Sequence, residues 1–503
     1  MLLQPGKTCW RVERAERLGL FIDMEEYFIA AREAMKQARF TIHALNWAFD
    51  PATLFQPDEN GDGPDSDRFG PFLRDLACAK PELDVRILCW KSALPVAASQ
   101  NFFPHRARKC FQNTPVKFRL DGSIPFGACH HQKMIVIDDR LAFCGGGDIG
   151  PDRWDTVHHL DDDPRRQIKP RKGKDFESRH ELMGLVDGEA AAALGTLFRD
   201  RWERATQESL SDKESLQAAV TEAETDEQPD PWPGCVPVAA RDVTVGIART
   251  LPKWRSYPEV RENEHLHLAS IKAAKTLIYM ENQYFTAPIM AQALAERLAE
   301  PHGPEVVLVS TLHSPSYFDQ ATMDKTRLKF LQVLKDADHA GRMSCFCPVT
   351  KKGRFIIVHA KLTIIDDELL RIGSSNLNNR STGFDTECDL VIEASEGGDD
   401  EATRKAIAKY RAQLMAHWLH RPIAAFEAEF AKKEGLAAAI HKLDDPDHRL
   451  MRPLEPKPIG PLAAMIARFH LGDPNGVEDS WRPWRREAAM LRGAKPHRSV
   501  LGK

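Results

Sequence analysis

The chain contains one short pattern twice, and this repeat limits the folds that it can adopt. Residues 131–138 read His-Gln-Lys-Met-Ile-Val-Ile-Asp, and residues 359–366 read His-Ala-Lys-Leu-Thr-Ile-Ile-Asp. In both copies apolar and β-branched residues surround the lysine and a pair of aspartates ends the run, which predicts a strand followed by a tight turn. Side chains two apart on a strand share a face, so each histidine projects with its lysine, Lys133 or Lys361. Two such strands side by side would place two imidazoles and two ammonium groups in one pocket.

The match between the two copies continues past the turn. Gly145 and Gly373 each lie 14 residues after the histidine of their copy, and Asp148 and Asn376 each lie 17 residues after it. A single pattern of this kind arises by accident in roughly a few per cent of chains this long, so one copy would be weak evidence. Two copies with the same trailing residues indicate an internal duplication.

With these features the chain resembles the phospholipase D superfamily. The resemblance rests on the two motifs, on their Gly-Gly and Gly-Ser tails, on Arg153-Trp154-Asp155 and on the stretch from Glu281 to Phe285, and it covers roughly residues 10–420. The last two stretches resemble the phosphatidylcholine-hydrolysing members more than the short nucleases. The resemblance implies a duplicated α/β fold, in which two similar halves pack as a pseudo-twofold pair.

Hydrophobic spacing predicts the same order of elements in both halves. The first half begins with helical spacing at residues 10–38, before a predicted strand at 40–50, and the corresponding segments of the second half are residues 266–275 and 277–285. Further predicted elements are strands at 85–90 and 306–310 and closing helices at 190–208 and 402–419. Helices that alternate with strands indicate mostly parallel sheets flanked by helices, one in each half.

These patterns divide the chain into four parts. They are an N-terminal half (1–208), an acidic and Pro-rich linker (209–240), a C-terminal half (241–420) and a C-terminal extension (421–503). The extension contains an amphipathic stretch and then basic residues beside tryptophans, which suit either a membrane interface or a strap packed on the core. A basic segment ending near Lys174 is either a solvated loop or a lipid-facing lid.

The composition is that of an ordinary soluble globular protein. The chain is 42% hydrophobic and 28% charged, with no apolar run near the roughly 20 residues that span a bilayer. Its first residues lack a secretory signal, which favours a cytoplasmic protein with peripheral membrane contact and leaves export by another route open. The formal net charge of −4 gives no overall attraction to nucleic acid. The ten cysteines have neither zinc-site nor disulfide spacing.

The repeated histidines and lysines suit phosphoryl transfer. A phosphodiester is negatively charged, so its cleavage requires positive charge, a nucleophile and an acid for the leaving oxygen. His131 is expected to attack phosphorus and His359 to protonate the leaving alcohol. This assignment follows the related phospholipases, because the sequence alone treats the two histidines alike. Lys133 and Lys361 would hold the non-bridging oxygens as compact positive charges.

Four further residues are assigned by their place in the duplication. Asn376 and, in the other half, Asp148 or nearby backbone N–H groups would complete the cradle for the phosphate oxygens. An attacking imidazole must be oriented through its second nitrogen, so each histidine needs an acceptor. Glu181 and Glu387 open the equivalent downstream strands and are predicted to be these acceptors, although Glu181 stands where the family usually has aspartate.

The remaining motif and aromatic residues have more than one interpretation. By the family pattern, Asp138 and Asp366 mainly fix the turns that set the two strands, and they count as motif residues. Trp154 and Tyr284 are candidates for a wall that binds a quaternary ammonium head group, or are plain core residues.

No metal ion or other cofactor is expected, since no metal-binding pattern accompanies the motifs and the lysines already supply positive charge. The neighbouring Arg153 and Asp155 are interpreted as a structural pair rather than as substrate contacts.

The resemblance therefore implies a phospholipase D that hydrolyses a glycerophospholipid, such as phosphatidylcholine, to phosphatidate and the head-group alcohol. A phosphohistidine intermediate would also allow transphosphatidylation. The alternatives are a phosphatidyltransferase of the cardiolipin-synthase type, a nucleic-acid phosphodiesterase and, outside enzymes, a lipid-binding protein with a degenerate site. The expected partners are phospholipid and a membrane surface, without nucleic acid. The sequence leaves the oligomeric state open and is compatible with a monomer.

Overall fold

The computed structural model describes residues 1–92, 103–166, 176–210, 230–314, 317–394 and 400–455, together with short stretches between residues 461 and 480. Three predicted features fall largely outside the described residues. They are the basic segment at 167–175, residues 211–229 of the linker and the tryptophan-rich end of the extension.

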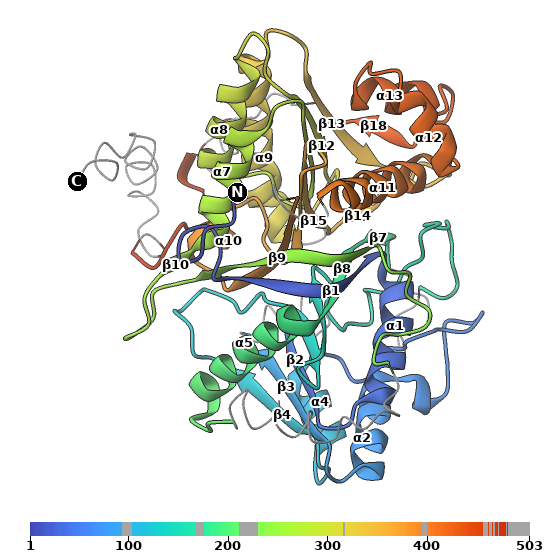
Figure 1. The fold of residues 1–503 in the computed structure, drawn as a ribbon, viewed down its shortest axis with the longest axis vertical. Helices are drawn as coiled ribbons and strands as arrows, with labels where there is room; N and C mark the ends of the chain where they lie inside the picture. Colours follow the sequence, from blue (N-terminus) through green and yellow to red (C-terminus); the bar gives the residue numbers. More distant parts are fainter. Residues whose placement is uncertain are drawn as a thin grey trace.

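The chain folds into two similar halves that share one large sheet (Figure 1). The strands of the N-terminal half are β1 (Arg11–Ile22), β2 (Thr41–Asn46), β3 (Asp84–Trp90), β4 (Lys117–Asp121), β5 (Met134–Ile137), β6 (Leu141–Gly145), β7 (Arg179–His180) and β8 (Leu182–Asp187). Its helices are α1 (Met24–Gln37), α2 (Phe69–Ala79), α4 (Pro104–Phe111) and α5 (Gly188–Thr206), with a short 3-10 turn, η1 (Asp65–Asp67).

The second half repeats this order. Its strands are β9 (Ala240–Leu251), β10 (Val260–Arg261), β11 (Leu277–Asn282), β12 (Glu305–Val309), β13 (Met343–Pro348), β14 (Ile357–Val358), β15 (Lys361–Ile365), β16 (Leu369–Gly373), β17 (Glu387–Glu393) and β18 (Met451–Pro453). Its helices are α7 (Glu262–Ala273), α8 (Pro288–Leu298), α9 (Tyr317–Ala337), α10 (Asn379–Gly383) and α11 (Asp400–Leu419), followed in the extension by α12 (Ile423–Phe430) and α13 (Leu436–Leu443).

The strand order displays the duplication directly. The N-terminal half runs β4-β3-β2-β5-β6-β8-β1, and the sheet continues through β9-β17-β16-β15-β11-β12-β13-β18. The long strands β1 and β9 pair antiparallel and cross the middle of the molecule in Figure 1. The two halves therefore meet at a pseudo-twofold axis between β1 and β9.

The α/β class is confirmed, but the expected predominance of parallel strands is wrong. Within the described part of the large sheet, parallel pairing joins β2 to β3, β3 to β4, β11 to β12 and β12 to β13. The motif strands instead form the antiparallel hairpins β5–β6 and β15–β16. A two-residue turn can only join antiparallel strands, whereas a parallel pair needs a long crossover, so the Asp-Asp turns dictate the mixed sheet.

The predicted helix at residues 10–38 is wrong in its first part. Residues Arg11–Ile22 form β1, and only Met24–Gln37 are helical. β1 lies in the middle of the sheet, hydrogen-bonded to β8 on one edge and β9 on the other. Long-range pairing of this kind overrides a local helical spacing.

The sequence suggested that the two motif strands lie side by side. In the sheet they are not neighbours, since six strands separate β5 from β15. They come together because the inner strands of the two halves face each other. Sγ of Cys144 on β6 lies 4.0 Å from Sγ of Cys388 on β17. A Cβ added to Gly184 on β8 would lie 3.1 Å from Cδ1 of Leu390.

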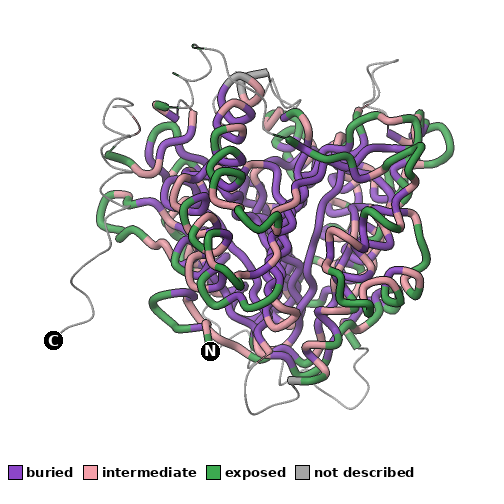
Figure 2. The backbone as a smooth tube through the Cα atoms, turned by 90° about the horizontal axis from the view of Figure 1, so that it is seen from above, coloured by how far each residue is buried: buried purple, intermediate pink, exposed green. Residues whose placement is uncertain are grey.

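Buried residues of both halves share one large apolar cluster, and two further large clusters lie mainly in the N-terminal and mainly in the C-terminal half. Figure 2 shows buried backbone through the centre of the molecule. Trp202 on α5 and Trp418 on α11, the closing helices of the two halves, are both buried. Among the described residues, no helix has the length and hydropathy needed to cross a membrane.

Candidate active site

The two Asp-Asp turns anchor the motif strands. Asp138, Asp139, Asp366 and Asp367 all have positive φ, between 52 and 56°, as a two-residue hairpin turn of type I′ requires. The carboxylate of Asp138 accepts backbone N–H groups of Arg39, Phe40 and Thr41, and that of Asp366 accepts those of Lys275, Thr276 and Leu277. Each aspartate therefore ties its turn to the start of the adjacent strand, in agreement with the expected structural role.

The glycines that follow each turn allow a close approach of backbones. A Cβ on Gly145 would lie 2.6 Å from the carbonyl oxygen of Leu182, and a Cβ on Gly146 would lie 3.4 Å from the carbonyl oxygen of His359. Gly146 thus belongs to one half and contacts the motif of the other. Gly145 is required because a side chain there would clash with Leu182 and Met183 of β8 in the same half.

A cavity of about 160 Å³ lies where the halves meet, and both motif histidines line it. Asp148, Asn376 and Tyr284, all predicted from the sequence, also line this cavity. Trp154 does not belong to it. Its indole is buried in a separate hollow, where the guanidinium of Arg165 lies 4.8 Å from the ring.

Each histidine is oriented by a glutamate from the opposite half. Nδ1 of His131 is hydrogen-bonded to Oε2 of Glu387 at 2.9 Å. Nδ1 of His359 lies 3.2 Å from Oε2 of Glu181, an ion-pair contact without the alignment of a hydrogen bond. Because Nδ1 is engaged in both rings, Nε2 is the nitrogen left for chemistry.

Two serine hydroxyls form hydrogen bonds with the carboxylate of Glu387. Oγ of Ser374 and Oγ of Ser381 donate to its carboxylate at 2.5 and 2.6 Å. The same two oxygens accept the backbone N–H groups of Cys388 and Asn376, so their own hydrogens are free to point at Glu387. Burial raises the pKa of Glu387, while Lys133 and the two hydroxyls act in the opposite direction.

Glu181 has different surroundings. Within the described chain its carboxylate oxygens accept no hydrogen bond of good geometry, and its Oε1 lies 3.7 Å from both Arg153 and Arg179. Burial raises the pKa of Glu181 to about 7, against the two arginines that lower it. The two His–Glu pairs are therefore equivalent in position but not in hydrogen bonding.

The histidines are held in the neutral form. Burial lowers the pKa of His131 well below its usual range, and the charges of Lys133 and Lys361 lower it further. Burial and Lys361 have the same effect on the pKa of His359. A neutral imidazole has a lone pair, so these surroundings favour nucleophilic attack and proton transfer.

The two motif lysines bond the backbone of their own histidines, and neither is among the residues that line the cavity, where the sequence predicted both ammonium groups. Nζ of Lys133 donates to the carbonyl oxygen of His131 at 2.7 Å and lies 3.4 Å from Asp148, and Nζ of Lys361 donates to the carbonyl oxygen of His359. Asp148 also accepts the backbone N–H groups of Trp47 and Ala48, at 2.9 and 3.1 Å. Asp148 thus organises the cavity wall as well as one lysine.

Several cavity residues were not predicted from the sequence. Arg153 was interpreted as a partner of Asp155, but Arg153 lines the cavity and its Nε lies 3.5 Å from Asp152. The carboxylate of Asp155 instead accepts the backbone N–H of Arg179, another cavity residue, at 2.9 Å. Arg179 lies two positions before Glu181, a spacing that could have placed both on one face.

Trp47 was also missed, and it lines the cavity that Trp154 does not reach. It directly follows Asn46, the last residue of β2, as Gln283 follows Asn282 at the end of β11. Gln283 lines the cavity as well. The internal duplication could therefore have identified Trp47 as a residue of the cavity.

Comparisons with known proteins find similar chains. A family model described as "Cardiolipin synthase, PLD-like domain" matches residues 268–418. Phospholipase D alpha 4 of Arabidopsis thaliana is 24% identical over 501 residues, covering 80% of this chain and 65% of the relative. Cardiolipin synthase 2 of Bacillus cereus is 25% identical over 285 residues, covering 57% of this chain and 45% of the relative. The chain thus spans less than two thirds of the length of these curated relatives.

A solved structure supports the fold. The phosphatidylserine synthase of Haemophilus influenzae superimposes with a TM-score of 0.53 at 14% identity, over 81% of this chain and 88% of that one. At this identity the likeness concerns the fold alone.

Proposed function

Because the chain belongs to the phospholipase D superfamily, we propose that it is a phospholipase D, which cleaves a glycerophospholipid between phosphorus and the head-group oxygen. One observation carries the proposal. Two imidazoles from opposite halves, each engaged through Nδ1 by a buried glutamate, line a single cavity together with buried arginines. Such a pair can supply both a nucleophile and an acid to one phosphodiester.

In the first step of the proposed reaction, Nε2 of His131 attacks phosphorus. A P–N bond forms and the bond from phosphorus to the head-group oxygen breaks. The negative charge of the bound phosphodiester favours a protonated His359, which donates its Nε2 proton to that oxygen, so the head group leaves as an alcohol and His359 becomes neutral. In the second step water attacks phosphorus, His359 accepts a proton of that water, and the P–N bond breaks to release phosphatidate.

The surroundings of the two glutamates support His131 as the nucleophile. Glu387 accepts two serine hydroxyls and Nδ1–H of His131, which holds the proton on Nδ1 and leaves a lone pair on Nε2. Glu181 lacks such donors among the described residues and faces two arginines instead. The pair of His359 and Glu181 is therefore better suited to the acid and base steps.

Positive charge and aromatic rings suit the substrate. Lys133, Lys361, Arg153 and Arg179 are all buried in or beside the cavity and would neutralise the phosphate. Trp47 and Tyr284 line the same cavity and offer ring faces to a quaternary ammonium group. Contact with a lipid surface follows from this substrate and is part of the proposal.

The test is product analysis with a panel of phospholipids, with and without a primary alcohol such as 1-butanol. We expect phosphatidate and free head group, and a phosphatidylalcohol when the alcohol is present. Both products should vanish in His131→Ala and in His359→Ala. Turnover that persists in these variants would point to a contaminant and leave a lipid-binding protein as the better description.

A second candidate is phosphatidyl transfer of the cardiolipin-synthase type, which is favoured by the family model over residues 268–418. Phosphatidylglycerol alone separates the two. A transferase would convert it to cardiolipin and glycerol, whereas a phospholipase D would release mainly phosphatidate and glycerol.

A further inference from the structure

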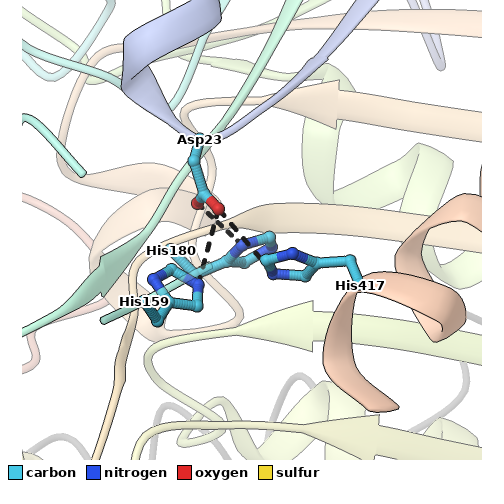
Figure 3. A group of neighbouring side chains, drawn as sticks. All are labelled: Asp23, His159, His180 and His417. Carbon is cyan, nitrogen blue, oxygen red and sulfur yellow. Dashed lines mark ion pairs between the residues drawn. The ribbon is translucent and has the colours of Figure 1, made fainter. Parts of the chain in front are cut away.

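A second cluster of titratable side chains lies outside the cavity. Asp23, His159, His180 and His417 are all buried, and one ligand atom from each lies within 4.8 Å of the others. Figure 3 shows the three rings gathered around the carboxylate of Asp23. Oδ1 of Asp23 lies 2.9 Å from Nδ1 of His180, and its Oδ2 lies 3.4 Å from Nε2 of His159 and 3.7 Å from Nε2 of His417.

Two of the three imidazoles are oriented from behind by carboxylates. Nε2 of His180 is hydrogen-bonded to Glu281 at 2.8 Å, and Nδ1 of His159 is hydrogen-bonded to Asp155 at 2.9 Å. In each ring the other nitrogen is the one that faces Asp23. Histidines that bind a metal through one ring nitrogen usually donate the other N–H to a carboxylate or another acceptor, which fixes the orientation of the ring.

Four buried ring and carboxylate atoms face the centre of the cluster. Oδ2 of Asp23, Nε2 of His159, Nδ1 of His180 and Nε2 of His417 make no hydrogen bond of good geometry in the described chain, although Nδ1 of His180 lies 2.9 Å from Oδ1 of Asp23. The side chains are at most 4% exposed. Buried polar atoms are costly when unsatisfied, so four of them aimed at one point indicate a missing partner.

We propose that Asp23, His159, His180 and His417 bind one divalent transition metal ion, with Zn²⁺ as the best chemical match. Three imidazoles and one carboxylate are ligands that zinc accepts in a closed tetrahedral site. Metal–nitrogen bonds of about 2.0 Å place tetrahedral ligand atoms about 3.3 Å apart, close to the separations between Asp23 and the rings. The site is separate from the cavity that holds His131 and His359.

The proposed ion would connect the two halves and support the active site. Asp23, His159 and His180 belong to the N-terminal half, whereas His417 lies on α11. Asp23 donates its backbone N–H to the carbonyl oxygen of Glu181 at 2.8 Å, and Glu181 donates its N–H to Oδ1 of Asp23 at 3.1 Å. A metal on Asp23 would thereby hold the backbone of the glutamate that orients His359.

The alternative to a bound metal ion is a proton on His180. Burial lowers the pKa of His180, but the carboxylates of Asp23 and Glu281 outweigh it and raise this pKa to about 10. A protonated His180 would balance the two carboxylates without a metal. A proton on His180 would not involve His417 in the cluster. Burial and the neighbouring rings His159 and His180 lower the pKa of His417 well below its usual range, so His417 stays neutral and does not pair with Asp23 as a cation.

The test uses the whole 503-residue chain, stripped with a chelator and then titrated with Co²⁺ and, separately, Zn²⁺. We expect one Zn²⁺ per chain by elemental analysis, visible absorption bands of a four-coordinate Co²⁺ site, and a higher Tm in the presence of either ion. His417→Gln should lose the Co²⁺ bands and the rise in Tm. His265→Gln, at an exposed position on α7, should keep both.

Two further measurements keep the result independent of folding and of catalysis. The double variant His131→Gln/His359→Gln should still bind the metal, because the active-site histidines are not ligands. Folded wild-type protein that takes up neither ion would overturn the proposal and leave a hydrogen-bonded network. Loss of binding in the double variant would also overturn it and place the metal in the cavity.

Discussion

His131 is hydrogen-bonded through Nδ1 to Glu387, which lies 256 positions later in the chain. The reciprocal contact joins His359 to Glu181. Each half therefore supplies one histidine and orients the histidine of the other half. Any change at the surface where the halves meet should act on both steps of the reaction.

Glu387→Gln should lower kcat by about 10²- to 10⁴-fold, with a small change in KM. The amide would donate as well as accept, so Nδ1–H of His131 and the hydroxyls of Ser374 and Ser381 would lose their common acceptor. Steady-state kinetics at saturating substrate would measure the effect. Glu368→Gln, on the turn between β15 and β16, is the matched control and should retain wild-type kcat. Equal kcat in both variants would contradict the orienting role of Glu387.

His359→Ala should still form a phosphohistidine from a phosphodiester with a good leaving group, such as p-nitrophenolate, because such a group departs without an acid. His131→Ala should not. A rapid burst of p-nitrophenolate, together with acid-labile, base-stable phosphorus on the protein, would measure the intermediate. The opposite pattern would make His359 the nucleophile.

In Glu181→Gln, which removes the carboxyl whose pKa is raised to about 7, kcat/KM should not fall as the pH drops through about 6.5, the usual imidazole pKa, and should decline only at lower pH. Burial and the two motif lysines lower the pKa of His131, so the neutral, reactive ring persists into acid. A pH profile of kcat/KM would measure this, with activity re-measured after return to neutral pH to exclude unfolding. An acidic limb centred at or above pH 6.5 would be inconsistent with the burial of His131.

Asp138→Ala should destabilise the protein by about 1–3 kcal/mol, because three backbone N–H groups at the start of β2 lose their acceptor. Asp162→Ala is the matched control. Asp162 has a similar positive φ of 54°, but its carboxylate makes surface ion pairs with Lys352 and Arg354. Urea unfolding would compare the two variants. Equal stability of both, with activity lost only in Asp138→Ala, would instead indicate a chemical role for Asp138.

Tyr284→Leu should raise KM for phosphatidylcholine about 2- to 30-fold, the equivalent of one cation–π contact of about 0.5–2 kcal/mol. Tyr284→Phe keeps the ring face and should keep most of the affinity. Trp154→Leu should change stability rather than KM, since Trp154 lies outside the cavity. A rise in KM confined to Trp154→Leu would reverse these assignments.

Much of the site could be predicted from the sequence because its elements are local and repeated. The spacing within each motif placed Lys133 beside His131, and the Asp-Asp pairs predicted both turns. The duplication marked Glu181 and Glu387 as equivalent. The spacing could not predict that each motif histidine contacts the glutamate of the other half. That pairing depends on how the inner strands of the two halves face each other.

Other sequence predictions were wrong or incomplete because they depend on contacts between distant parts of the chain. The strand β1 looked helical because its pairing partners, β8 and β9, lie more than a hundred residues away. Trp154 stands next to Arg153 in the chain, yet only Arg153 lines the cavity. Asp23 and the three histidines around it are scattered from position 23 to position 417, so no short motif indicated that they meet.

The exchange of glutamates between halves has a consequence for the history of this fold. A shorter ancestor with a single copy would have held a histidine without its own carboxylate, and it could have worked only as a symmetric dimer in which each subunit completed the other. Fusion of two genes would have made that dependence permanent within one chain, after which the two pairs were free to diverge, as the serines around Glu387 and the arginines around Glu181 have done.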